Sequence, residues 1–234
     1  MKHVRQNGRF RLEVIGHPDY GLPFGQDRLV PLWVATLAVR QQSRTVSFDS
    51  AAQVLDYFGL PKDGVHYRRL IKSFKRIFAS SVYFGSSDAQ HRNRAWEFSR
   101  FHFFDRMKVW YAPSGHTLPE GAARNLIVLS ELFWREISCH PIPFDASVIR
   151  ALAHSPGSVD FYTWLSRRSY NTRTEDRIPL FGPRGLVAQL GVGEYTRDRN
   201  FRKRLREWLN DVRLCWAECP ARISDDGSAL IVAP

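Results

Sequence analysis

The segment HYRRLIKSFKRIF, residues 66–78, decides how the first half of the chain is interpreted, because it separates charged from apolar side chains with a helical period. Its large apolar residues recur at three- and four-residue steps, which places them on one face of a helix. They are Tyr67, Leu70, Ile71, Phe74, Ile77 and Phe78. The cations lie on the opposite face with no acidic residue among them: Arg68, Arg69, Lys72, Lys75 and Arg76. A face of one sign predicts contact with a polyanion, and nucleic acid is the polyanion we favour.

The charge of the whole chain agrees with this interpretation. Its 34 Lys and Arg residues against 23 Asp and Glu residues give a formal net charge of +11. Such an excess is typical of proteins that bind nucleic acid or an anionic membrane. No stretch approaches the roughly 18 apolar residues that span a bilayer, and the N-terminal MKHVRQNGRFRLEV lacks the apolar block of a signal peptide. We therefore expect a soluble, intracellular protein.

The residues around the basic segment predict a helix-turn-helix. A long buried helix is expected over residues 26–42, a short strand over residues 45–48, and then a compact helix capped by Asp49 or Ser50. The glycines and proline of FGLPKDG end that helix just before the basic one. Two helices joined by a tight turn, the second with a charged outer face, are the arrangement that reads the major groove of DNA.

A hairpin is expected after the basic helix. SSVYF and AWEFSRFHFF read as its strands, and the polar loop between them carries Arg92 and Arg94. A hairpin in this position is a wing, whose basic tip commonly contacts phosphate, although a solvated loop would explain the same residues. KVWY is expected to extend this sheet, and the Pro/Gly-rich PSGHTLPEGAARN marks a domain boundary near residue 120.

The second half repeats this order. We expect a strand at Leu126–Leu129, a short helix up to His140, two helices over residues 145–154 and 158–169, and a brief strand RIPLF. GLVAQLGVG then resembles QVLDYFGLP of the first half, and each is followed by a basic amphipathic helix.

The second basic helix is TRDRNFRKRLREWLNDVRLCW, in which an apolar stripe is flanked by cations. ARISDDGSALIVA closes the chain as a hairpin with DDG at its turn, which would be a second wing. We therefore predict an α+β fold of two tandem winged-helix domains, residues 1–120 and 121–234.

Signatures of catalysis are missing from the sequence. It has no phosphate-binding G-x-x-x-x-G-K-[ST] loop and no closely spaced histidine pair that would hold a catalytic metal. The three cysteines, Cys139, Cys215 and Cys219, form no C-x-x-C pair. Tyr170 and Tyr195 lie near arginines but lack the organised base that would make a phenol a DNA-cleaving nucleophile. We expect no enzymatic activity, no cofactor and no metal.

One long block, GLPFGQDRLVPLWVATLAVRQQSRTVSFDSAAQVLDYFGLPKDGVHYRRL, resembles the plasmid-encoded RepA family of replication initiators, and FHFFDRMKVWY and VDFYTWLSRR continue the likeness. The resemblance implies a bacterial cytoplasmic protein that binds repeated DNA sequences at a plasmid origin, opens an adjacent AT-rich segment, and recruits the host initiator and the replicative helicase. It also implies binding as a monomer, with a homodimer as the repressing form in some relatives. The positions that match the DNA-facing helices are the five cations above and, in the second half, Arg197, Arg199, Asn200, Arg202, Lys203 and Arg206.

The hypothesis is that two major-groove helices on one chain read adjacent segments of one repeat. Arg68 and Arg69 are the predicted base readers of the first helix, because arginine pairs with guanine through two hydrogen bonds, while its other cations hold phosphates. For the second helix the predicted base readers are Arg199, Arg202 and Arg206. Two alternatives stay open at this point: a winged-helix transcriptional repressor, and a DNA-cleaving enzyme that uses a tyrosine.

Overall fold

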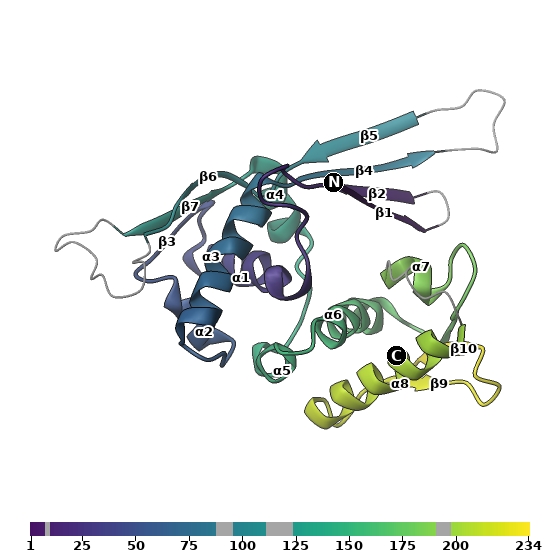
Figure 1. The fold of residues 1–234 in the computed structure, drawn as a ribbon. Coiled ribbons are helices and arrows are strands. Elements are labelled where there is room, and N and C mark those ends of the chain that lie inside the picture. Colours follow the sequence, from purple (N-terminus) through teal and green to yellow (C-terminus); the bar gives the residue numbers. More distant parts are fainter. Residues whose placement is uncertain (8–9, 88–95, 111–123, 191–197) are drawn as a thin grey trace. The chain divides into compact units, whose positions relative to one another are not determined.

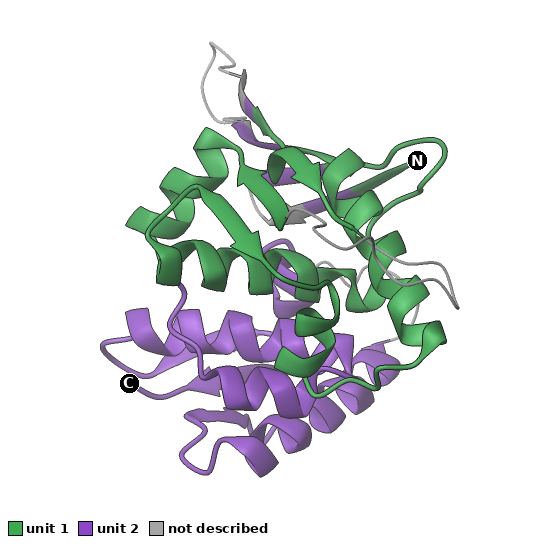
Figure 2. Cartoon of the chain, turned by 90° about the vertical axis from the view of Figure 1, so that its left-hand side faces the viewer, with its two compact units in different colours: residues 1–3, 14–82, 100–141 green, residues 4–13, 83–99, 142–234 purple. Residues whose placement is uncertain are grey.

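The computed structural model describes residues 1–7, 10–87, 96–110, 124–190 and 198–234. The chain divides into two compact units, which are coloured separately in Figure 2. The first unit contains residues 1–3, 14–82 and 100–141, and the second contains residues 4–13, 83–99 and 142–234. The division expected near residue 120 lies outside the described residues. The strand and helix that follow it, up to residue 141, belong to the first unit.

The described part of the first unit combines one 3-10 helix and four α-helices with a three-stranded antiparallel sheet, and Figure 1 labels these α-helices and strands. In chain order its elements are the 3-10 helix η1 (Gly25–Arg28), α1 (Leu29–Gln41), β3 (Thr45–Phe48), α2 (Ala52–Tyr57), α3 (Gly64–Ala79), β6 (Phe104–Lys108), β7 (Asn125–Leu129) and α4 (Glu131–Cys139). The sheet order is β3-β7-β6, so the last strand is the central one. Its register places Val46 opposite Ile127, and Met107 opposite the same residue on the other side.

Aromatic side chains form the centre of this unit. Phe48 on β3 meets Trp33 of α1 edge-on, with 4.9 Å between ring centroids, and stacks on Phe74 of α3 at 6.4 Å. Because all three rings are buried, they join the sheet to the two long helices. Pro31 lies in the first turn of α1, where it costs the helix no internal hydrogen bond.

The predicted elements around α3 are largely confirmed. The strand at Thr45–Phe48 is present, α1 covers most of the expected helix, and the hydroxyl of Ser50 accepts a hydrogen bond from the backbone of Ala52 at the start of α2. One residue of the predicted apolar face differs, because Phe78 at the end of α3 is 38% exposed.

The second unit contains the helices α5 to α8 and a second three-stranded antiparallel sheet. Its elements are α5 (Ala146–Leu152), α6 (Pro156–Asn171), β8 (Asp176–Pro179), α7 (Leu186–Leu190), α8 (Asp198–Cys215), β9 (Ala221–Ile223) and β10 (Ala229–Val232). The sheet order is β8-β10-β9. Phe161 of α6 and Phe201 of α8 both pack against Trp208. Gly157 lets α6 approach that indole closely, since a Cβ at this position would lie 2.5 Å from its nitrogen.

The two units share one order of elements. Each runs through a long helix, a strand, a short helix and a basic helix to two final strands, and in each sheet the last strand lies between the other two. In the first unit α1, β3, α2, α3, β6 and β7 follow this order, and in the second α6, β8, α7, α8, β9 and β10 do so. The repetition expected from the sequence is therefore present in the topology.

A four-stranded sheet interrupts the first unit in sequence, and most of its residues, 4–13 and 83–99, are counted with the second unit. It has the order β1-β2-β4-β5 and consists of β1 (Lys2–Asn7), β2 (Phe10–Ile15), β4 (Ser81–Ser87) and β5 (Trp96–Phe101). The hairpin β4–β5 therefore belongs to a larger sheet. The next strand, β6, ends at Lys108, where the predicted strand KVWY begins, and it pairs with β7. Arg92 and Arg94, the predicted tip of this hairpin, lie outside the described residues. The strands β1 and β2 were not predicted, although Asn7-Gly8 is a strong hairpin signal in the sequence.

Within the described segments, no helix is both long enough and apolar enough to cross a bilayer. The same segments contain no group of three or more His, Cys, Asp or Glu side chains that could hold a metal ion.

Replacing Phe74 by Ala should lower the free energy of unfolding by about 3–5 kcal/mol, because the ring is 1% exposed and its removal leaves a cavity between α3 and the sheet. Phe78→Ala is the matched control on the same helix, and it should cost much less because that ring is partly in solvent. Urea titrations of the two variants measure the difference. Equal losses would contradict the assigned orientation of α3.

Candidate nucleic-acid interface

The start of α3 is fixed by two short-range features. The helix α2 ends at Tyr57, and Gly59, two residues later, has the left-handed φ of 63° that turns the chain away from the helix. Asp63 then caps α3: one carboxylate oxygen accepts hydrogen bonds from the backbone N–H groups of Val65 (2.9 Å) and His66 (2.8 Å), and the His66 ring lies 2.9 Å away. These bonds from His66, first from its backbone and then from its ring, lower the pKa of the Asp63 carboxyl. The turn therefore sets where the basic face of α3 begins.

Three cations of α3 point into solvent. Arg68, Arg69 and Lys72 are all exposed, and we call them the α3 basic face. Arg69 makes one long hydrogen bond of 3.3 Å to the Gln26 side chain. In the described part of the chain, no carboxylate forms an ion pair with any of the three. Their charge is therefore available to a ligand.

Arg76 has a structural role, which corrects its predicted contact with phosphate. Its guanidinium forms two hydrogen bonds to the Asp27 carboxylate, at 2.6 Å and 2.9 Å. The side chains are only 11% and 3% exposed, respectively. The Arg76 guanidinium also lies 4.5 Å from the centroid of the Phe24 ring. Sequence periodicity placed Arg76 on the charged face, but its partner is 49 residues away along the chain and gave no local signal.

Asp27 gathers donors from two segments. Besides Arg76 it accepts hydrogen bonds from the Ser73 hydroxyl on α3 and from the backbone N–H of Phe24. Because a buried carboxylate is costly unless it is paired and hydrogen-bonded, this cluster holds η1 against α3 in one arrangement. Lys75, which was also predicted to contact phosphate, directly precedes Arg76 on α3 and is half-buried.

The helix α8 presents a second exposed basic surface. Arg199, Lys203 and Arg206 are exposed and form what we call the α8 basic face, and Asn200 is exposed beside them. The opposite side of the helix is buried through Phe201, Leu205, Trp208, Leu209 and Val212. Arg197, which was also predicted to face DNA, lies outside the described residues.

Arg202 differs from its prediction as a base reader. It is half-buried, donates a hydrogen bond of 3.2 Å to the carbonyl of Gly227, and places its guanidinium 5.1 Å from the centroid of the Phe181 ring. These contacts attach the β9–β10 hairpin to α8. We therefore assign Arg202 to packing within the unit.

The turn of the β9–β10 hairpin is acidic, unlike a phosphate-contacting wing tip. Asp226 accepts hydrogen bonds from the hydroxyls of Ser224 (2.6 Å) and Ser228 (2.8 Å), and pairs with Arg177 at 3.0 Å. The bonds from Ser224 and Ser228, together with Arg177, keep the pKa of Asp226 far below its ordinary value. A carboxylate that stays ionised repels phosphate, so this turn does not supply the contact expected of a second wing.

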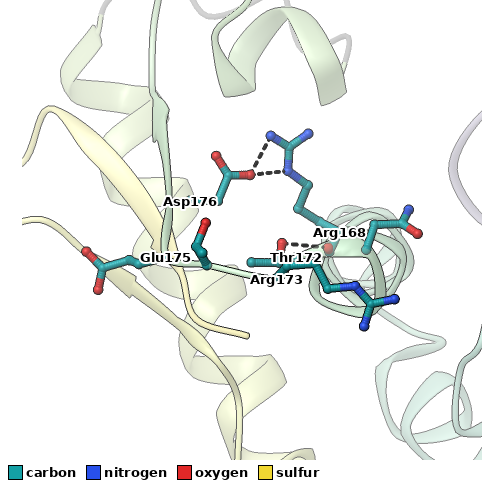
Figure 3. A pocket seen from close by; sticks show the side chains of 7 residues that line it. Arg168, Thr172, Arg173, Glu175 and Asp176 are labelled. Carbon is teal, nitrogen blue, oxygen red and sulfur yellow. Dashed lines mark hydrogen bonds and ion pairs between the residues drawn. The ribbon is translucent and has the colours of Figure 1, made fainter.

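A polar depression of about 380 Å³ lies at the end of α6 (Figure 3). Arg168 points toward Asp176 across it, with nitrogen–oxygen distances of 2.5 and 2.6 Å. Glu175 on its rim pairs with Arg222 at 3.4 Å. Because cations and carboxylates alternate here, the depression does not have the single sign that a polyanion site needs.

The comparisons with known proteins bear on these surfaces. A family model described as plasmid-encoded RepA protein matches residues 62–178, which are half of the 234 residues and include α3. The chain belongs to this family. No curated protein sequence matches it.

Two solved structures share the fold of this RepA-family chain. One is the crystal structure of RctB domains 2–3, with a TM-score of 0.61 and 14% identity over 100% of this chain and 91% of that chain. The other, of selenomethionine derivatives of RctB domains 2 and 3, has a TM-score of 0.63 and 12% identity over 96% of this chain and 80% of that chain. The likeness therefore covers both units.

Replacing Arg76 by Ala should lower the free energy of unfolding by about 3 kcal/mol, because Asp27 would be left buried without its cation. The loss falls at the low end for a broken buried pair, since Ser73 and Phe24 still donate to Asp27. Lys72→Ala is the control on the exposed face and should change stability by no more than about 0.5 kcal/mol. Removing Asp27 as well as Arg76 should cost less than the sum of the single changes. Chemical denaturation measures the free energy of unfolding of the Arg76, Asp27 and Lys72 single variants and of the Asp27/Arg76 double variant. If the double variant loses the sum of the Asp27 and Arg76 single losses, the pairing is contradicted.

Replacing Asp63 by Asn should make the stability of the folded protein less dependent on pH. The folded pKa of Asp63 is lowered, so its charge stabilises the fold above the ordinary value of 3.8 and this contribution disappears as the pH falls through the folded pKa. The melting temperature of the original protein should therefore exceed that of the variant near pH 5, and the gap should narrow toward pH 3. A gap that stays constant between these values would show that the charge of Asp63 has no effect.

Proposed function

We propose that this protein is a plasmid replication initiator that binds repeated double-stranded DNA through α3 and α8. The α3 basic face is the observation that carries the proposal: three exposed cations stand on a helix whose opposite side is buried in a packed unit. Membership of the plasmid-encoded RepA family supports the assignment to replication.

The proposal includes a winged-helix identity for both units. The order of helix, strand, two helices and two strands, with the last strand central, supports it in each unit. By this topology β6 and β7 are the wing strands of the first unit, because they follow the basic helix in the shared sheet. In the second unit the acidic β9–β10 turn leaves α8 as the element that meets DNA.

The side chains of the two basic faces suit two kinds of DNA contact, base recognition by arginine and phosphate binding by lysine. Arg68 and Arg69, near the start of α3, can pair with the O6 and N7 atoms of guanine, each such pair contributing about 1–3 kcal/mol of discrimination. Lysine supplies a point charge for phosphate. If the two faces neutralise about six phosphates, affinity should fall roughly 10³-fold between 50 and 200 mM salt.

Origin opening and recruitment of the host initiator and helicase complete the proposal. A binding protein without nucleotide hydrolysis must cover the cost of bending and opening DNA from its own binding energy, so several protein copies on adjacent repeats would act together. We further propose that the protein cleaves no DNA. Incubation with origin DNA and a divalent metal, followed by a denaturing gel, should show neither a nick nor a protein–DNA adduct.

Changing Arg68 and Arg69 together to Ala should abolish repeat-specific binding while the fold survives, because both side chains are exposed. Footprinting on the DNA that flanks the gene, followed by gel-shift titration on the protected sequence, measures the effect. Arg135→Ala is the matched control, since Arg135 is an exposed arginine of α4 in the same unit. Unchanged affinity in the double variant would remove α3 from the interface.

The same variants separate replication from repression. A plasmid that carries the gene should fail to replicate when the Arg68/Arg69 double variant replaces the original protein. If the plasmid replicates normally and only expression of neighbouring genes changes, the protein is a transcriptional repressor.

A further inference from the structure

Val65 stands on the same face of α3 as its exposed cations. It lies three, four and seven residues before Arg68, Arg69 and Lys72, so the four side chains form one stripe. The Val65 side chain is 55% exposed, although it is apolar, and it lies in the first turn of the helix. The capping bond to Asp63 uses only its backbone N–H. Its side chain therefore has no evident role in stabilising the unit.

The helix α8 carries a different residue at the equivalent position. The buried residues Leu70, Phe74 and Ile77 of α3 have the same spacing as Leu205, Leu209 and Val212 of α8. In this alignment Val65 corresponds to Asn200, because each precedes the first of its three residues by five positions. Both side chains are exposed near the start of their helix, but one is apolar and the other is an amide.

We propose that Val65 reads a thymine, by packing on the C5 methyl group in the major groove. This inference rests on the proposed DNA binding of α3. Residues in the first turns of a recognition helix contact base edges, and the thymine methyl is the apolar feature of the major groove. A valine suits that contact because its branched side chain is restricted to few rotamers and loses little entropy when it is held.

The consequence concerns the target sequence. Arginines beside Val65 favour guanine, so α3 should read guanine and thymine close together. At the matching position of α8 the amide of Asn200 can pair with the N6 and N7 atoms of adenine. The two helices then require different bases, and the repeat they bind has a direction and is not a palindrome.

The test uses the duplex identified by footprinting, in which each thymine is replaced singly by deoxyuridine, which lacks only the methyl group. One replacement should weaken binding of the original protein about fourfold, the factor expected for about one buried methyl-sized group. Val65→Ala should bind the unmodified duplex more weakly by a similar factor and should not respond to that replacement. The coupling between the two changes is the decisive readout, because a general loss of affinity would not produce it.

Two further variants complete the design. Val39→Ala, on α1, is the control for an exposed valine, since Val39 is 49% exposed, and it should respond to deoxyuridine as the original protein does. Val65→Thr keeps one methyl group and should retain part of the response. If Val65→Ala is as sensitive as the original protein at every thymine, the inference about Val65 is wrong while DNA binding by α3 stands. If the original protein protects no duplex, the proposed function and this inference are both wrong.

Discussion

The ion pair between Asp27 and Arg76 is the constraint on which the placement of α3 depends. It joins η1 to α3. The same buried Asp27 carboxylate also accepts hydrogen bonds from the Ser73 hydroxyl and from the backbone N–H of Phe24. An apolar contact could slide along the helix, whereas a guanidinium that forms two hydrogen bonds to a carboxylate fixes both distance and rotation. The direction of the exposed Arg68, Arg69 and Lys72 therefore depends on a pair whose carboxylate is buried. The same helix uses arginine for two opposite purposes, and burial distinguishes them.

Much of the architecture could be predicted because it follows from local patterns. The alternation of Thr45–Phe48, the breaks at Gly59 and Pro61 and the period of residues 66–78 are each readable within a few residues, and the corresponding elements are present. The buried side of α8 could also be predicted from its stripe of large apolar residues. These patterns work because a helix or strand that packs on a core must bury one side, and the sequence records which side that is.

The roles of individual cations were less predictable, since they depend on partners far away in the sequence. Arg76 is paired across 49 residues and Arg202 is held by a carbonyl 25 residues later, so neither the helical period nor the local charge could assign them. The same limit applies to strand pairing. The strands β4 and β5 were expected from their composition, but their place in one sheet with β1 and β2 depends on pairing between segments far apart in the sequence. The Asn7-Gly8 pair, by contrast, is a local sequence signal for the pairing of β1 with β2.

The position of the last strand in each sheet bears on how the protein folds as it leaves the ribosome. Strands β3 and β6 have no partner in their sheet until Asn125–Leu129 has been synthesised, and β8 and β9 likewise wait for Ala229–Val232. Until then the outer strands of each sheet expose backbone N–H and C=O groups that lack the central strand as a partner. Strands with unpaired backbone groups are prone to aggregation. Deleting only Ala229–Val232 would remove the middle strand of a sheet, so the loss of this one short segment would have a far larger effect than its length suggests.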